Sequence, residues 1–161
     1  MIKVLFVCLG NICRSPMAEG IFQRLIVDDC LGEKVACDSA GTASYHIGEL
    51  PDERMRQTAL TKAIELTHRA RAFQANDWLD FDYILVMDKA NFKNVQKLRR
   101  ENARATLYLM REFDVLEPGS EVPDPWYGDI AGFEDCYEIL YRSCHVFLQE
   151  LKAKHQWETK R

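Results

Sequence analysis

The feature that most constrains the fold is a short apolar run near the start of the chain, followed by a polar loop and then a helix start. Lys3–Cys8 (KVLFVC) is rich in β-branched and aromatic residues, which predicts a buried strand. Ser15-Pro16 predicts a helix start, with Ser15 as N-cap and Pro16 as the first helical residue. A buried strand that leads straight into a helix favours an α/β fold.

The same alternation continues along the rest of the chain. Further strands are expected at Val35–Ser39, Tyr83–Met87 and Thr106–Met110, and further helices from Asp52, over 89–100 and from about Phe133. Strands and helices that alternate in this way form a parallel sheet with helices on both faces. No repeat or low-complexity linker interrupts residues 1–161, so we expect a single domain. Ligands of such sheets bind beyond the carboxyl ends of the strands.

Composition excludes several classes of partner. The net charge of −4 offers no electrostatic reason to expect a nucleic acid. The apolar run Val4–Leu9 is too short to span a membrane and is not followed by a signal-peptide cleavage site. We therefore expect a cytoplasmic protein that binds neither nucleic acid nor membrane. Its six cysteines are then expected to be mostly thiols in a reducing compartment.

The loop after the first strand, residues 8–15 (CLGNICRS), has the composition of a phosphate site. A loop that opens a helix turns several backbone N–H groups toward an anion, and the helix dipole adds positive charge. Gly10 permits a backbone conformation closed to most residues, and Asn11 tolerates positive φ. Arg14 can hold two phosphate oxygens at once, and the same positive field favours a nucleophilic thiolate at Cys8. No Gly-Lys-Ser/Thr follows, so this is not a Walker loop.

A second Cys-x5-Arg pattern shows that this spacing alone does not identify a phosphate site. Cys136 and Arg142 repeat it, and Ser143 follows as Ser15 does. That copy has no glycine and no preceding strand, and it lies on the apolar stripe of the last expected helix, so we interpret Cys136 as a core residue.

The chain resembles the low-molecular-weight protein tyrosine phosphatases. The resemblance rests on residues 7–16 (VCLGNICRSP), 38–42 (DSAGT), 81–85 (FDYIL) with Met87-Asp88, and 124–128 (DPWYG), in family order. It implies a single three-layer α/β domain with a four-stranded parallel sheet in the order 2-1-3-4. It also implies hydrolysis of phosphotyrosine and small aryl phosphates, without metal or cofactor.

The resemblance also implies roles for individual residues. Cys8 is the nucleophile, Arg14 binds the phosphate, and Asp124 acts first as general acid and then as base. The other phosphate-binding residues are Leu9, Gly10, Asn11, Ile12, Cys13 and Ser15.

Supporting roles follow from the same resemblance. Ser15 would hydrogen-bond the thiolate, Cys13 would be the redox partner of Cys8, and Asp88 would have a structural role near the loop. Ser39 and His68 would support the loop with Asn11, and the substrate pocket would be formed by Leu9, Tyr45, Trp126 and Tyr127. Trp126 stands where the family commonly has tyrosine, which leaves substrate preference open.

Three alternatives compete with this interpretation. A thiol-dependent arsenate reductase needs a relay of cysteines after the third strand, and none lies between Cys37 and Cys136. A phosphate-binding or redox-sensing module would not need Asp124. A zinc site at Cys8 and Cys13 would need two more converging ligands. The expected partner is a tyrosine-phosphorylated protein or an aryl phosphate, bound by a monomer or weak homo-oligomer.

Overall fold

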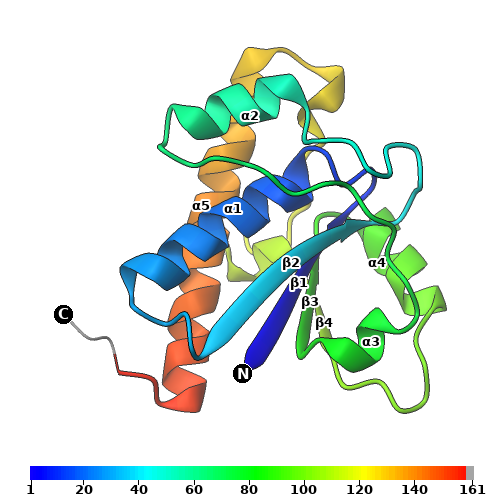
Figure 1. The fold of residues 1–161 in the computed structure, drawn as a ribbon, viewed down its shortest axis with the longest axis vertical. Coiled ribbons are helices and arrows are strands. Elements are labelled where there is room, and N and C mark those ends of the chain that lie inside the picture. Colours follow the sequence, from blue (N-terminus) through cyan, green and yellow to red (C-terminus); the bar gives the residue numbers. More distant parts are fainter. Residues whose placement is uncertain (159–161) are drawn as a thin grey trace.

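A four-stranded parallel sheet forms the centre of the molecule (Figure 1), in a computed structural model that describes residues 1–158. The strand order is β2-β1-β3-β4, with β1 at Ile2–Cys8, β2 at Val35–Gly41, β3 at Tyr83–Val86 and β4 at Thr106–Leu109. The expected fold class and strand order are confirmed. Because β1 pairs with β2 on one side and β3 on the other, the chain direction across the sheet reverses at β1. This is the point where open α/β sheets bind ligands, and Cys8 ends that strand.

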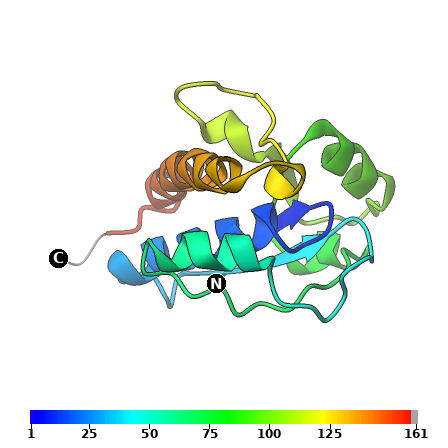
Figure 2. The ribbon, with the colours of Figure 1, turned by 90° about the horizontal axis from the view of Figure 1, so that it is seen from above.

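Helices cover both faces of the sheet, as expected (Figures 1 and 2). One face carries α1 (Arg14–Asp28), α2 (Glu53–Leu60) and α5 (Ile130–His155). The other face carries α3 (Asp77–Asp80) and α4 (Lys89–Lys97). Two short 3-10 turns, η1 (Met110–Phe113) and η2 (Pro125–Tyr127), lie between β4 and α5. No helix within residues 1–158 is long and apolar enough to cross a membrane.

The core is divided by the sheet. The larger part packs α1 and α5 against one face, where Phe22 lies 5.5 Å from Phe6 and 5.7 Å from Phe147 between ring centroids. Cys136 belongs to this part, as expected, and its burial raises the pKa of the thiol to about 12. Arg142 does not approach it in a phosphate-binding arrangement, because its guanidinium binds Asp114.

Several element boundaries differ from those expected. The last helix begins at Ile130 because the Asp129 carboxylate accepts a hydrogen bond from the Gly132 N–H at 3.3 Å. The second helix starts as expected, with Asp52 as N-cap, but ends at Leu60, and Ala63 has a positive φ of 58°. β2 continues through Gly41 instead of turning before it.

The start of α1 corrects one prediction about Ser15. The helix begins at Arg14, so Cys13 is the N-cap and Pro16 is the third helical residue. Proline is tolerated there because N–H groups of the first turn have no partner inside the helix. Ser15 is the second helical residue and therefore not the N-cap. Its hydroxyl lies 3.0 Å from Cys8 Sγ.

Candidate active site

The backbone of the phosphate loop (residues 8–15) turns at Asn11. Asn11 has a positive φ of 56°, as its residue type allows, whereas Gly10 does not have positive φ. The prediction that Gly10 adopts a backbone conformation closed to most residues is therefore wrong. A Cβ at this position would lie 3.2 Å from Cδ2 of His46, so the glycine lets that ring pack closely on the loop.

A chain of hydrogen bonds reaches Cys8 from behind the loop. Ser15 Oγ lies 3.0 Å from Cys8 Sγ and 3.3 Å from the Ala40 carbonyl oxygen. Asn11 Nδ2 donates to Ser15 Oγ at 2.7 Å, so the serine hydroxyl keeps its own proton for the sulfur or for Ala40. The Ser15 hydroxyl is therefore placed to donate a hydrogen bond to the sulfur of Cys8.

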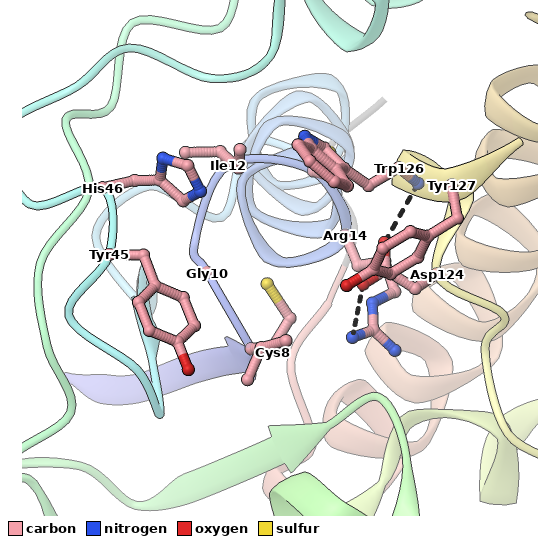
Figure 3. Close-up of a pocket in the computed structure, with 11 residues that line it drawn as sticks. Cys8, Gly10, Ile12, Arg14, Tyr45, His46, Asp124, Trp126 and Tyr127 are labelled. Atoms are coloured by element: carbon pink, nitrogen blue, oxygen red, sulfur yellow. Dashed lines mark hydrogen bonds and ion pairs between the residues drawn. The ribbon is translucent and has the colours of Figure 1, made fainter.

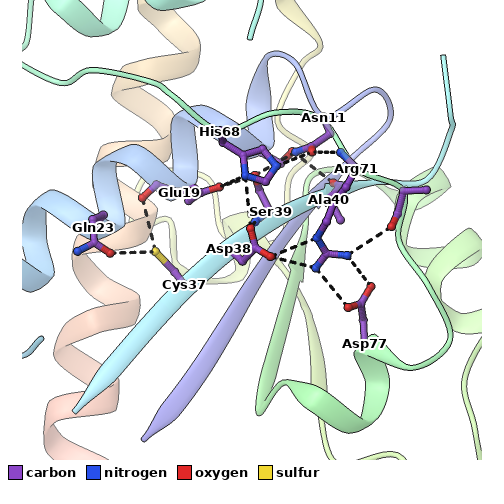
Figure 4. A network of polar contacts seen from close by, with 12 residues as sticks. Asn11, Glu19, Gln23, Cys37, Asp38, Ser39, Ala40, His68, Arg71 and Asp77 are labelled. Atoms are coloured by element: carbon purple, nitrogen blue, oxygen red, sulfur yellow. Dashed lines mark hydrogen bonds and ion pairs between the residues drawn. The ribbon is translucent and has the colours of Figure 1, made fainter. Parts of the chain in front are cut away.

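The side chain of Asn11 holds the loop to its support, as Figure 4 shows. Its Nδ2 also donates to Ser39 Oγ at 3.0 Å, and its Oδ1 accepts from the Arg71 N–H at 3.0 Å. His68 Nε2 lies 2.9 Å from the same Oδ1. The structure thus brings Asn11, Ser39 and His68 together, as the sequence interpretation predicts.

Titratable groups extend this support behind the loop. Glu19 accepts a hydrogen bond from Ser39 Oγ at 2.6 Å, but burial raises its pKa to about 7. Burial lowers the pKa of His68, and the Arg71 guanidinium lowers it further against the opposing effect of Asp38. Within residues 1–158, Glu19, Asp38 and His68 are the group whose donor atoms lie close enough to hold a metal ion.

Arg14 is buried and oriented by acceptors on two other segments. Its Nη1 donates to Asp88 Oδ2 at 2.8 Å and to the Val122 carbonyl oxygen at 2.9 Å. Both hydrogens of Nη1 are in use, which leaves the Nε and Nη2 side to hold two anionic oxygens. Burial opposes the charge of Arg14, but the negative charges of Cys8 and Asp88 raise its pKa overall. Asp88 also caps α4, accepting from the Asn91 N–H at 2.8 Å.

Asp124 lies at the rim of the same cavity. Its Oδ1 accepts a hydrogen bond from the Trp126 N–H at 3.1 Å, which caps η2. Its Oδ2 lies 3.6 Å from Arg14 Nη2. The carboxylate is thereby held beside the anion site but remains partly open to solvent.

The cavity above Cys8 has a volume of about 180 Å³. Figure 3 shows Tyr45 and His46 on one side of Cys8 and Trp126, Tyr127 and Asp124 on the other. All the expected pocket residues line it: Leu9, Tyr45, Trp126 and Tyr127. Tyr45 and Tyr127 are 76% and 79% exposed as residues, so they form an aromatic entrance and not a packed core.

Sequence reasoning missed one residue of this cavity, His46. Its ring packs on Gly10 and its Nδ1 contacts Glu49. The only signal in the sequence is its position next to Tyr45, because no motif links residue 46 to residue 10.

Comparisons with known proteins show which family the chain is similar to. The family model described as low molecular weight phosphotyrosine protein phosphatase matches residues 3–157. The chain is 38% identical over 152 residues to the Homo sapiens low molecular weight phosphotyrosine protein phosphatase, covering 92% of this chain and 94% of the human one. It is 38% identical over 151 residues to the Schizosaccharomyces pombe protein of the same name, covering 93% and 97%. A crystal structure of a protein tyrosine phosphatase from Entamoeba histolytica superposes with a TM-score of 0.91 at 37% identity, covering 96% of this chain and 99% of the other.

Proposed function

The chain belongs to the low molecular weight phosphotyrosine protein phosphatases and hydrolyses phosphotyrosine, and we propose that the reaction proceeds through a cysteinyl phosphate on Cys8. The observation that supports this mechanism is the meeting of Cys8, Arg14 and Asp124 in one cavity with an aromatic entrance. Binding alone would need the anion site but not a carboxylic acid at its rim.

In the first step the Cys8 thiolate attacks phosphorus in line with the tyrosyl oxygen. The S–P bond forms as the P–O bond breaks, and Asp124 donates its proton to the leaving oxygen. The loop N–H groups and the Nε and Nη2 side of Arg14 hold the equatorial oxygens, where negative charge is greatest. Ser15 stabilises the thiolate before the attack and after release.

In the second step Asp124, now a carboxylate, removes a proton from water. The resulting nucleophile attacks phosphorus, the S–P bond breaks, and inorganic phosphate leaves with the Cys8 thiolate restored. One carboxylate serves both steps because the first step leaves it deprotonated. Ser39 and His68 act through Asn11 and are positioning residues.

Steady-state hydrolysis of aryl phosphates tests this mechanism. Cys8→Ser is expected to abolish turnover. Asp124→Ala is expected to lower kcat roughly 10²- to 10⁴-fold while substrate binding is kept, because the leaving group loses its proton donor. The loss should shrink for leaving groups that depart without a proton. Full activity of Cys8→Ser, or the same Asp124→Ala loss for every leaving group, contradicts the proposal.

We also propose that Cys13 is the redox partner of Cys8, since both thiols line the same cavity. Peroxide converts Cys8 to a sulfenic acid, and the Cys13 thiol displaces water to form a disulfide that a thiol reductant reverses. Burial, with Asp52 adding to it, raises the pKa of Cys13, so Cys8 is expected to react with peroxide first. After peroxide, wild type should recover with a thiol and Cys13→Ser should recover less. Equal recovery argues against this role.

The setting of the site supports further assignments. We propose that its substrate is a tyrosine-phosphorylated protein or an aryl phosphate, whose ring Tyr45, Trp126 and Tyr127 would flank.

All six cysteines are free thiols, which supports a reducing, cytoplasmic location that cell fractionation can test. We propose that residues 1–161 act as one domain, as a monomer or weak homo-oligomer, and sedimentation measurements would detect a stable larger assembly.

A further inference from the structure

The segment that contains α4 is strongly basic, although the chain as a whole is acidic. Residues 89–104 carry six lysines and arginines against one acid, whereas the remainder of the chain carries 15 against 24. Lys89, Lys93 and Lys97 of this segment lie on α4, and all three are exposed. Because residues four apart lie on the same side of a helix, they form one row, which we call the basic stripe.

The fold makes no use of the basic stripe. Within residues 1–158, Lys62, Arg104 and Lys152 each pair with a carboxylate, whereas no lysine of the stripe does. Like charges four residues apart repel one another and weaken a helix. The stripe therefore opposes the stability of α4, and an acidic group from outside the chain would relieve this repulsion.

The stripe begins beside the anion site. Asp88, the N-cap of α4, accepts a hydrogen bond from Arg14 at 2.8 Å, and Lys89 is the next residue. Glu121 also lies at this end of α4, where its carboxylate accepts the Lys89 N–H at 2.7 Å. Figure 1 shows α4 at the outer edge of the molecule, away from α1, α2 and α5. The stripe is thus continuous with the catalytic site and open to a partner.

The length of the stripe suits a polypeptide. An α-helix rises about 1.5 Å per residue, so Lys97 lies about 12 Å along α4 from Lys89. An extended chain advances about 3.3–3.6 Å per residue and covers that distance in about four residues. A polypeptide whose phosphotyrosine fills the catalytic cavity can therefore extend along the stripe, whereas a small aryl phosphate ends at the cavity.

We propose that the basic stripe binds acidic side chains of the protein substrate, so that phosphotyrosine in an acidic segment is preferred. This inference rests on the proposed function of the same site. The bound phosphotyrosine holds its own segment at the rim, which raises the local concentration of acidic side chains at the stripe. The acidic remainder of the chain would repel the broad anionic surface of a membrane or a nucleic acid, whereas a peptide segment contacts the stripe alone. Because the stripe does not touch the reacting atoms, it lowers KM and leaves kcat nearly unchanged.

Two phosphotyrosine peptides of equal length test the proposal. One carries aspartate and glutamate on both sides of the phosphotyrosine, and the other carries asparagine and glutamine at the same positions. Wild type at low salt is expected to show a kcat/KM at least about threefold higher for the acidic peptide, mainly through KM, because several exposed ion pairs form together. Added salt should remove this preference, because it screens exposed charges.

Charge reversal within the stripe provides the variants. Lys93→Glu and Lys97→Glu are each expected to lower the ratio of the two kcat/KM values to about one or less. This ratio is taken within one variant, so a general loss of activity or of folded protein cancels. Lys34→Glu is the matched control, because Lys34 is also exposed but precedes β2, at the end of the sheet away from the active site. It changes the net charge equally and should keep the wild-type ratio.

The outcomes separate this inference from the proposed function. Equal ratios in wild type and both stripe variants, or the same decrease in Lys34→Glu, overturn the inference. Binding to phosphatidylserine vesicles that Lys93→Glu abolishes, together with equal hydrolysis of both peptides, would assign the stripe to a membrane and also overturn it. If wild type hydrolyses both peptides equally well, only this inference fails. If it hydrolyses neither, the proposed function fails and this inference fails with it.

Discussion

At the scale of single residues, Asn11 combines two requirements that few side chains meet together. Its backbone has a φ of 56°, and its amide makes hydrogen bonds to Ser15, Ser39, His68 and the Arg71 N–H. The side chain is 1% exposed, so water cannot replace these bonds. The shape of the loop around Cys8 therefore depends on this one amide.

Replacing Asn11 by alanine is expected to destabilise the protein by about 2–4 kcal/mol, because several buried polar groups lose a partner. kcat/KM for an aryl phosphate should fall with it, since the loop loses its support. Asn11→Gly is the control, because glycine removes the same bonds but relieves about 1 kcal/mol of positive-φ strain. Urea unfolding and steady-state kinetics measure both effects. An alanine variant as stable as wild type would contradict the role of the network.

The sequence predicts the role of a site residue best when that role depends on the residue itself or on its neighbours in the sequence. The positive φ of Asn11 is a property of its own side chain and could be predicted. The close packing at Gly10 involves His46, a ring 36 positions away in the sequence, and no local pattern predicts that contact. The placement of Ser39 and His68 could be predicted only by resemblance, because no local pattern connects them to the loop.

At the scale of elements, the end of β2 packs directly against the backbone of the phosphate loop. Gly41 pairs with Cys8 in the β1–β2 register, and its N–H and C=O also bond to Arg71 and Phe73. A Cβ at Gly41 would lie 2.8 Å from the Leu9 carbonyl oxygen and 3.1 Å from the Asn11 N. Those atoms belong to the backbone of the loop and cannot move aside alone.

Gly41→Ala is therefore expected to push the loop away from β2 and lower kcat/KM at least about tenfold, a loss equivalent to about 1.4 kcal/mol of transition-state stabilisation. Gly32→Ala is the matched control, because a Cβ there meets nothing within 4 Å and φ is not positive. It should keep full activity, with a stability change of less than about 1 kcal/mol. Equal activity of the two variants would show that the close approach at Gly41 is unimportant.

Elements with strong periodic or apolar patterns could be predicted, and their ends could not. β1, β3 and the helices that follow them lie close to the expected positions. α2 is shorter than its apolar pattern indicates, because Ala63 leaves the helical conformation and Ile64 reaches the core from the following loop. α3 has four residues, too few for a periodic signal.

At the scale of the whole molecule, general rules about βαβ units explain the strand order of the sheet. They do not explain how the long β4–α5 connection is held against α5. Asp114, whose side chain is fully buried, binds Arg111 of η1 at 2.9 Å and Arg142 of α5 at 3.1 Å. In the same turn, Glu117 binds Arg111 at 2.9 Å but is 65% exposed. One buried carboxylate thus ties the connection to the last helix, and sequence spacing does not reveal which of these acids is buried.

Asp114→Asn is expected to destabilise the protein by about 3 kcal/mol at neutral pH, because the buried Arg111 loses its one buried carboxylate and keeps only the exposed Glu117. Glu117→Gln, the control, should cost less than about 1 kcal/mol because the Glu117 carboxylate is exposed to water and Arg111 keeps Asp114. Although burial opposes ionisation, hydrogen bonds from Arg142, the Leu116 N–H and Arg111 lower the pKa of Asp114 to about 2, from an ordinary value of 3.8. The stabilisation is therefore complete above about pH 4 and is lost as the pH falls toward about 2.

Urea unfolding of wild type and Asp114→Asn as a function of pH measures this dependence. The difference in their free energies of unfolding should be largest near about pH 7 and should narrow at about pH 3, because there the Asp114 carboxyl of the unfolded wild-type chain takes up a proton while that of the folded protein stays mostly ionised. The Glu117→Gln difference should stay small at both values. A gap for Asp114→Asn that stayed constant or widened in acid would mean that the charge of Asp114 does not hold the connection against α5, and that its hydrogen-bonding shape alone is sufficient.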